Sequence, residues 1–246
     1  MGMNGQLAKH YAHRGFHDKP AVPENSLAAF SRAASHGYPV EFDVHLIADG
    51  SLVVFHDDDM ERETGVPGLL DDMTLERLSA LRLEGTDEKI PTFDEVLSVF
   101  EDTGLPLLIE LKPSRGNHKE LADKVCERLS GYRGEYVLES FDPRALLEVR
   151  KVAPDTCVGQ LAQDFIKKRD GVKLYQAVIL KYMMYNVLVR PDFIAYRFPD
   201  IGCRPAKSAI KRGVPFAVWT IDTPRDYRYA IEHGLVPIFE RFEPKV

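Results

Sequence analysis

Short apolar segments alternate with amphipathic stretches along the whole chain of 246 residues. This alternation is typical of folds in which a helix follows each strand of a parallel sheet. We expect strands at 9–13, 40–46, 105–111, 135–140, 156–161, 192–198, 214–221 and 236–240. From the helical spacing of apolar residues we expect helices within 24–37, 92–104, 117–131, 143–153 and 204–213. Eight strands in about 250 residues predict an α/β fold, a (β/α)8 TIM barrel, with a doubly wound open sheet as the alternative.

Two segments interrupt the alternation. After the second expected strand, an Asp-Gly turn leads into an extended piece and then into a mostly polar stretch at 58–89. In a barrel this stretch lies at the carboxyl ends of the strands, where barrel enzymes hold their chemistry. We therefore expect residues 1–246 to form one TIM-barrel domain with a small insertion at about 57–89. The segment 172–191 is rich in Tyr, Met and Leu, and leaves open a flanking helix, a dimer contact and ordinary core packing.

The composition excludes some classes of protein. A formal net charge of −6 argues against a general nucleic-acid binder, which needs clustered Lys and Arg, but allows a local cationic pocket for a small anion. No run approaches the roughly 18 apolar residues of a membrane helix, and residues 1–15 hold no signal-peptide-like apolar stretch. Cys126, Cys157 and Cys203 are widely spaced, so we interpret them as free thiols. These features predict a cytoplasmic protein without stable membrane insertion, and they leave a homo-oligomer open.

Acidic side chains follow apolar residues near the ends of two expected strands. Alternate residues of a strand face the same side, so Glu41 and Asp43 point the same way, as do Glu110 and Lys112. Neighbouring strand ends of a barrel would gather the three carboxylates, which then need a cation among them or protonation. An all-oxygen cluster favours Mg²⁺ or Ca²⁺, with Mn²⁺ also acceptable, over zinc. A structural salt bridge is the alternative.

Two histidines are expected beside this cluster. His13 and Arg14 end the first expected strand, and His56 follows the extended piece after the second. Two groups that titrate near neutral pH can divide the roles of general acid and general base. The plainer alternatives are a turn with a hydrogen-bonded His13, and a hydrogen bond from His56 to the aspartates that follow it. His45 shares the face of the carboxylates and is interpreted as a supporting residue.

The segment "PENS" at 23–26 precedes an expected helix. Asn25 or Ser26 suits the N-terminal cap of that helix, and Pro23 suits a position just before it. We expect these residues to cap the helix and to fix the loop under His13, rather than Glu24 or Asn25 to take a direct part in catalysis.

The motifs "AHRG", "PENSLAAF", "EFDV", "VVFHD", "IPTFDEVL" and "IELK", in this order over residues 12–112, resemble the glycerophosphodiester phosphodiesterase family. "ESFDP" at 139–143 and "VWTID" at 218–222 resemble its later segments more loosely. The resemblance implies a TIM barrel that hydrolyses glycerophosphodiesters to glycerol 3-phosphate and an alcohol with one divalent cation. It also implies the site: His13 and His56 as the acid/base pair, Glu41, Asp43 and Glu110 as metal ligands, Arg14 and Lys112 at the phosphate, and Phe141 and Trp219 as apolar walls.

The chain departs from this family at its last expected strand. The family commonly has Thr-Asp before a Pro there, whereas this chain has "IFERFEP" at 238–244. Glu240, within that motif, is able to replace the aspartate in charge.

Three other functions are compatible with these residues. A lysophospholipase D-type phosphodiesterase would use the same site and would need an exposed apolar groove beside Phe141 and Trp219. A non-catalytic binding protein would share the scaffold, although both histidines are present. A Schiff-base aldolase would use Lys112, but neighbouring carboxylates favour its charged, non-nucleophilic form. Because the insertion carries no hydrophobic flap, we expect small soluble glycerophosphodiesters rather than intact lipids as substrates.

Overall fold

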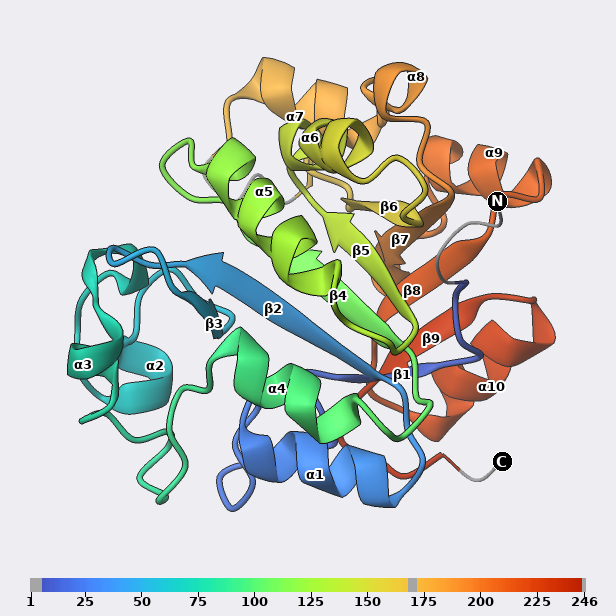
Figure 1. Cartoon of the computed structure of the whole chain (residues 1–246). Coiled ribbons are helices and arrows are strands. Elements are labelled where there is room, and N and C mark those ends of the chain that lie inside the picture. The colour runs from blue at the N-terminus through green and yellow to red at the C-terminus, as the bar shows by residue number, and fades with distance from the viewer. Residues whose placement is uncertain (1–5, 168–171, 245–246) are drawn as a thin grey trace.

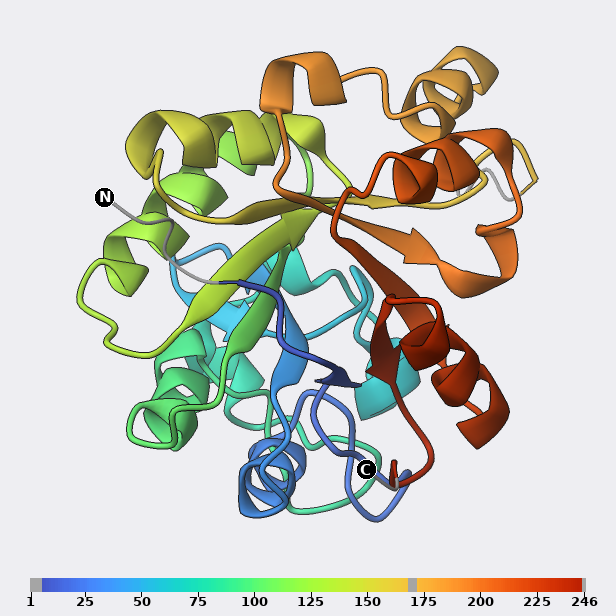
Figure 2. The ribbon, with the colours of Figure 1, turned by 90° about the vertical axis from the view of Figure 1, so that its right-hand side faces the viewer.

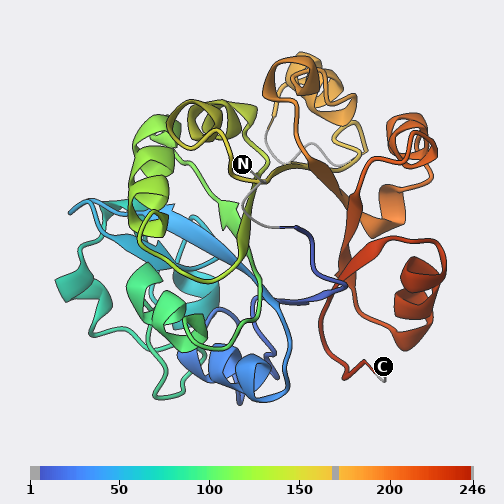
Figure 3. The ribbon, with the colours of Figure 1, turned by 45° about the vertical axis from the view of Figure 1, so that its right-hand side comes forward.

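The computed structural model describes residues 6–167 and 172–244. The stretch 1–15, for which we expected no signal peptide, therefore has its first five residues outside the described part. Eight parallel strands form a ring around a common centre (Figure 3). In order around the ring they are β1 (Tyr11–His13), β2 (Val40–Leu46), β4 (Leu107–Leu111), β5 (Tyr136–Ser140), β6 (Val158–Ala162), β7 (Phe193–Arg197), β8 (Phe216–Ile221) and β9 (Val236–Phe239).

The first strand closes the ring. β1 pairs in parallel with both β2 and β9, and Figure 2 shows it between them. The TIM-barrel prediction is therefore confirmed, and the open-sheet alternative is wrong. β1 is shorter than expected, because only Tyr11–His13 pair with a neighbouring strand, and Ala12 pairs with both β2 and β9.

Helices cover the outside of the barrel (Figure 1). They are α1 (Leu27–Ser35), α4 (Phe93–Phe100), α5 (His118–Leu129), α6 (Pro143–Val152), α7 (Leu174–Lys181), α8 (Asn186–Val189), α9 (Arg204–Lys211) and α10 (Pro224–Glu232), with a 3₁₀ turn, η2, at Phe198–Asp200. Capping side chains fix where several begin. Ser26 Oγ accepts a hydrogen bond from the Ala29 N–H at 3.1 Å, which confirms the predicted cap of α1.

The alternation of side chains along each strand separates two apolar layers. One set points outward and packs under the helices, as Val40, Phe42 and Val44 of β2 do. The other set fills the barrel interior, with Tyr11, Leu108, Val137, Leu161, Phe193, Ala217 and Ile238 among it. Inward-facing positions near the carboxyl ends of the strands are polar instead, and these positions hold the site.

The expected insertion follows β2 at the left of Figure 1. The extended piece before it forms β3 (Leu52–Val54), which pairs antiparallel with β2, and the stretch 57–89 contains α2 (Glu61–Thr64), a 3₁₀ turn η1 (Leu70–Asp72) and α3 (Leu75–Leu78). The mostly polar sequence nevertheless buries a small apolar cluster of its own, which includes Phe55, Met60, Leu70, Leu78, Leu83 and Ile90.

The undecided segment 172–191 forms α7 and α8, which lie outside the barrel between α6 and α9 (Figure 3). Ordinary core packing accounts for Ala177, Met183 and Val189, the three residues of this segment that are buried. Among the described residues, no helix has both the length and the apolar character needed to cross a membrane. All three cysteines are free thiols.

Candidate active site

Three carboxylates meet inside the carboxyl end of the barrel. Glu41 and Asp43 come from β2, and Glu110 comes from β4, where it lies directly beside Asp43 in the sheet register. Each offers an oxygen within 4.8 Å of the others, and all three side chains are buried. The local rule that alternate strand residues share a face is sufficient to bring them together.

The three carboxyl groups strongly perturb one another. Burial and the charges of Asp43 and Glu110 raise the pKa of Glu41 well above its usual value. Burial also raises the pKa of Glu110 to about 7, with Asp43 adding to the effect and Lys112 opposing it. Burial acts to raise the pKa of Asp43 too, but Lys112, His56 and Arg14 outweigh it and lower that pKa. Asp43 therefore ionises first of the three, and Glu41 and Glu110 hold their protons to higher pH.

These residues fit a divalent cation. The donors are all oxygen atoms, which Mg²⁺ and Ca²⁺ prefer. The amide of Asn25, the residue after Glu24, donates to Asp43 Oδ2 at 2.9 Å, while its own buried Oδ1 has no hydrogen-bond partner among the described residues. A cation among the three carboxylates would relieve the repulsion that raises the pKa values of Glu41 and Glu110.

Two basic side chains border the carboxylates. The backbone N–H of Arg14 donates to Glu41 at 3.0 Å, and its guanidinium lies 3.6 Å from Asp43. Lys112 Nζ lies 3.5 Å from both Asp43 and Glu110, and these two carboxylates raise its pKa in spite of its burial. Both side chains are therefore cations held at the edge of the cluster, where an anion can bind.

His13 lies between two carboxylates. Its Nδ1 is 2.7 Å from Oε2 of Glu240, which follows β9, and its Nε2 is 3.8 Å from Glu41. Glu240 is ionised, because His13 and His17 lower its pKa against the effect of burial. An ionised carboxylate only accepts hydrogen bonds, so Nδ1 of His13 carries the proton and Nε2 faces the cluster. Burial, followed by the charge of Arg14, lowers the pKa of His13.

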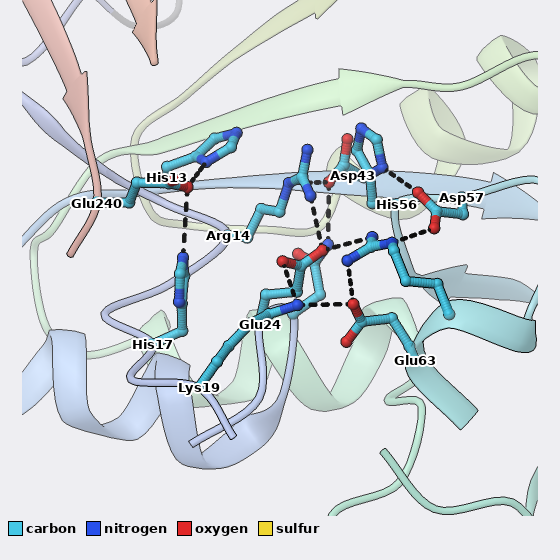
Figure 4. Close-up of polar contacts among 12 residues, drawn as sticks. His13, Arg14, His17, Lys19, Glu24, Asp43, His56, Asp57, Glu63 and Glu240 are labelled. Carbon is cyan, nitrogen blue, oxygen red and sulfur yellow. Dashed lines mark hydrogen bonds and ion pairs between the residues drawn. The ribbon is translucent and has the colours of Figure 1, made fainter. Parts of the chain in front are cut away.

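His56 occupies the other side of the site. Figure 4 shows His13 and His56 on opposite sides of Arg14 and Asp43. His56 Nδ1 lies 2.5 Å from Asp57, so the expected hydrogen bond to a following aspartate is present. Burial lowers the pKa of His56, and Asp43 acts against this shift.

A chain of ion pairs runs from the PENS loop to the insertion (Figure 4). Glu24 accepts from Arg14 at 2.6 Å and from Arg62 at 2.9 Å, and it lies 2.7 Å from Lys19. Lys19 also reaches Glu63 at 2.7 Å, and Arg62 pairs with Asp57, the partner of His56. Glu24 thus supports Arg14 rather than facing the carboxylate cluster, in line with the expected indirect role of this segment.

A cavity of about 490 Å³ opens beside His13. Its lining includes Arg14, His17, Thr220 and Glu240. A larger hollow of about 550 Å³, near α5 and the loop after α6, is lined by none of the site residues predicted from the sequence.

Phe141 and Trp219 lie together at the carboxyl ends of β5 and β8. Their ring centroids are 5.6 Å apart in an edge-to-face arrangement, and both pack partly exposed on the interior apolar layer. The cavity beside His13 is lined by neither ring. The structure therefore places these two residues at the barrel mouth, next to each other and outside that cavity.

With this geometry in place, comparisons with known proteins decide the family. The model of the glycerophosphoryl diester phosphodiesterase family matches residues 13–240. The chain belongs to this family. It is thereby a phosphoric diester hydrolase. A glycerophosphodiester phosphodiesterase of Caldanaerobacter subterraneus is 31% identical over 234 residues, covering 91% of this chain and 90% of its own. A lysophospholipase D of Rattus norvegicus is 33% identical over 232 residues, covering 88% of this chain and 70% of its own.

Solved structures of phosphodiesterases share the fold. A phosphodiesterase of Oleispira antarctica, in complex with the product sn-glycerol-3-phosphate, superposes with a TM-score of 0.79 at 25% identity, covering 95% of this chain and 93% of its own. A glycerophosphodiester phosphodiesterase of Thermotoga maritima gives a TM-score of 0.71 at 27% identity, covering 96% of this chain and 95% of its own.

Two residues beside the site, Glu139 and His17, were not predicted from the sequence as part of it. Glu139 of β5 lies beside Glu110 in the register, is 1% exposed, and has an oxygen without a hydrogen-bond partner among the described residues. Burial and the three cluster carboxylates raise its pKa well above the usual value. The sequence did offer a signal for Glu139, because it lies two residues before the predicted site residue Phe141 and therefore on the same side of the strand. His17, whose Nε2 lies 3.5 Å from Glu240, is in a loop and gave no such signal.

Proposed function

We propose that this enzyme hydrolyses glycerophosphodiesters to glycerol 3-phosphate and an alcohol, with His13 and His56 as the acid/base pair and one divalent cation at Glu41, Asp43 and Glu110. The observation that carries the proposal is the placement of His13 and His56 on opposite sides of Arg14 and Asp43 (Figure 4). Hydrolysis of a phosphodiester needs a base for the attacking oxygen and an acid for the leaving oxygen, on opposite sides of phosphorus.

Arg14 and Lys112 are proposed to hold the phosphate. Both are cations that pair with Asp43. A phosphate that binds beside Asp43, or takes its place as their partner, keeps both positive charges neutralised. Phosphoryl oxygens gain negative charge in the transition state, and fixed cations stabilise that charge. When bound, the divalent cation would add Lewis-acid stabilisation of the same oxygens.

Each histidine has a carboxylate on its far nitrogen, which leaves the other nitrogen to move a proton. Glu240 accepts from Nδ1 of His13, and Asp57 lies at Nδ1 of His56. In the first step the base removes a proton from the attacking oxygen while the acid donates one to the departing alcohol. The attacking oxygen belongs either to water or to the glycerol 2-hydroxyl; the second route passes through a cyclic phosphate that water opens after the two histidines exchange roles.

We propose Mg²⁺ or Ca²⁺ as the ion, with Mn²⁺ as a substitute, because all the donors are oxygen.

We further propose that residues 1–246 act as one domain with residues 57–89 as its insertion. The ion pairs from Glu24 to Arg62 and from Lys19 to Glu63 support this organisation, because they join the insertion to the loop after β1. Three free cysteines fit the proposed cytoplasmic location.

Small head groups are the proposed leaving alcohols. A second candidate is lysophospholipase D activity, which the relative in Rattus norvegicus carries in its name. The specific observation in its favour is a row of three rings: Trp219 lies 5.6 Å from Phe141, and Phe141 lies 5.8 Å from Phe165. Turnover of long-chain lysolipids without turnover of glycerophosphocholine would favour the second candidate.

The test is release of glycerol 3-phosphate from glycerophosphocholine and glycerophosphoethanolamine by enzyme stripped with EDTA, before and after Mg²⁺ or Ca²⁺ is returned. We expect turnover only after the cation is restored. Full turnover in EDTA, or release of phosphocholine in place of glycerol 3-phosphate, would contradict the proposal.

A further inference from the structure

An exposed apolar surface covers α7 and α8. Six large apolar side chains among the described residues expose half or more of their area, and all six lie in this segment. They are Leu174, Tyr175, Tyr182, Met184, Val187 and Leu188, exposed by 50% to 79%. We call these six residues the α7–α8 surface. Exposed apolar side chains gathered in one short segment mark a binding face, whereas single exposed apolar residues do not.

The described part of the chain leaves half or more of the area of each of these side chains uncovered. α7 and α8 lie outside the barrel (Figure 3), and their packing uses other residues. Ala177 and Val189 are buried, and Arg150 of α6 holds the end of α8 through the carbonyl oxygens of Val189 and Arg190. The helices are therefore anchored to the barrel on one side and present apolar side chains on the other.

The charges around the surface indicate what binds it. Residues 172–191 contain Lys173, Lys181 and Arg190 and no acidic residue, in a chain whose net charge is −6. Lys181 is paired with the buried Asp164 at 2.7 Å, but Lys173 and Arg190 are exposed. A second copy docking through this face would bring like charges together, whereas anionic lipid head groups would neutralise them.

We propose that the α7–α8 surface docks the enzyme on the face of an anionic phospholipid bilayer. Tyr, Leu, Val and Met side chains enter the boundary between head groups and acyl chains, and Lys173 and Arg190 contact the lipid phosphates. Short helices that lie on a membrane in this way do not span it.

The docking surface is connected to the barrel mouth. Asp164 follows β6 and holds Lys181 of α7, and the next residue, Phe165, packs edge-to-face on Phe141. A membrane-bound α7 therefore keeps the mouth of the barrel close to the lipid surface. The inference stands on exposure and charge, so it does not depend on the proposed function, and binding is measured without turnover.

The test uses the full chain and flotation with vesicles of phosphatidylcholine alone or mixed with phosphatidylglycerol. We expect about 30-fold tighter binding to the anionic vesicles, since Lys173 and Arg190 near the surface each add about 1 kcal/mol. Added salt should weaken this binding. Equal binding to both vesicles, or to neither, would overturn the proposal.

Two matched double variants locate the surface. Val187→Ser/Leu188→Ser on α8 should lose vesicle binding, while Tyr229→Ser/Ile231→Ser, which changes two exposed apolar residues on α10, should keep it. Circular dichroism and turnover of glycerophosphocholine report whether both variants fold. The proposal would be overturned if the protein did not bind vesicles and instead formed a concentration-dependent dimer that only the substitutions on α8 abolish. The surface would then belong to a contact with a second copy. Lys173→Glu should reduce the preference for anionic vesicles.

Discussion

Nδ1 of His13, in the first strand of the barrel, lies 2.7 Å from Oε2 of Glu240, the residue that follows the last strand. This contact orients the ring, because the carboxylate holds the Nδ1 proton and turns Nε2 toward Glu41. The structure gives Glu240, which belongs to the segment "IFERFEP", a place directly beside His13. We interpret Glu240 as a positioning residue.

Glu240→Gln should lower kcat by roughly 10²-fold with little change in KM, because the amide holds the ring without a charge. Glu240 acts to raise the pKa of His13, so its loss lowers that pKa further. The limb of the kcat profile that requires protonated His13 should therefore move to lower pH. Arg241→Gln is the control, since Arg241 is exposed and pairs with the other oxygen of Glu240. An unchanged kcat and an unmoved limb would rule out the positioning role.

Glu41→Gln should abolish the stabilisation of the protein by Mg²⁺ or Ca²⁺. In EDTA the variant should unfold at a higher temperature than the wild type, because one of the mutually repelling carboxyl groups is removed. The wild type should gain about 2.7 kcal/mol at a cation concentration a hundred times the Kd, and the variant almost none. Thermal unfolding with and without the cation measures both effects. The control is Asp72→Asn, an exposed acidic residue paired with Arg115; a variant of Glu41 that responds to the cation like the wild type would contradict the assigned site.

Glu24→Gln should weaken both folding and substrate binding. The change leaves Arg14, Lys19 and Arg62 without their shared, nearly buried partner. We expect a loss of about 2 kcal/mol in the free energy of unfolding, reduced from the cost of a fully buried pair by the exposure of Lys19 and Arg62. KM should rise because Arg14 loses its 2.6 Å contact. Urea unfolding and steady-state kinetics measure the two effects, and Glu101→Gln, at an exposed pair with Arg133, is the control; an unchanged KM would show that Glu24 does not orient Arg14.

Glu139→Gln should change how stability depends on pH in the metal-free protein. Burial raises the pKa of Glu139 well above the usual value of a glutamate, so its contribution to stability is complete below the unfolded pKa and is lost as pH rises toward the folded pKa. The variant and the wild type should be similarly stable near pH 4. Above that pH, up to the folded pKa of Glu139, the free energy of unfolding of the variant should rise relative to that of the wild type by about 1.4 kcal/mol for each pH unit. Urea unfolding in EDTA from acid to neutral pH tests this; parallel stability curves would contradict a proton held on Glu139.

The fold was predictable because it depends on local patterns. All eight strands of the barrel fall within a few residues of their predicted bounds, since each is a short apolar run. The insertion was harder, because Met60, Leu70, Leu83 and Ile90 are widely spaced among polar residues and form a cluster only after folding. In α7 the apolar residues lie on all sides, so no face indicated which side is buried.

The site was predictable where a strand carries it. Parity alone placed Glu41 and Asp43 together, and the barrel order added Glu110. The partners of the histidines were less accessible to sequence reasoning. Glu240 lies 227 residues from His13, and His17 belongs to a loop without periodicity. Contacts of this kind arise from barrel closure, which no window of the sequence contains.

The most direct test of the account is kcat for metal-restored release of glycerol 3-phosphate from glycerophosphocholine by His13→Asn, His56→Asn and the double variant. Each single variant should lose about 10²–10⁴-fold, because each removes one proton transfer. The double variant should fall by less than the product of the single losses, since both histidines serve one step. A single variant that keeps near wild-type kcat would contradict the paired roles of His13 and His56.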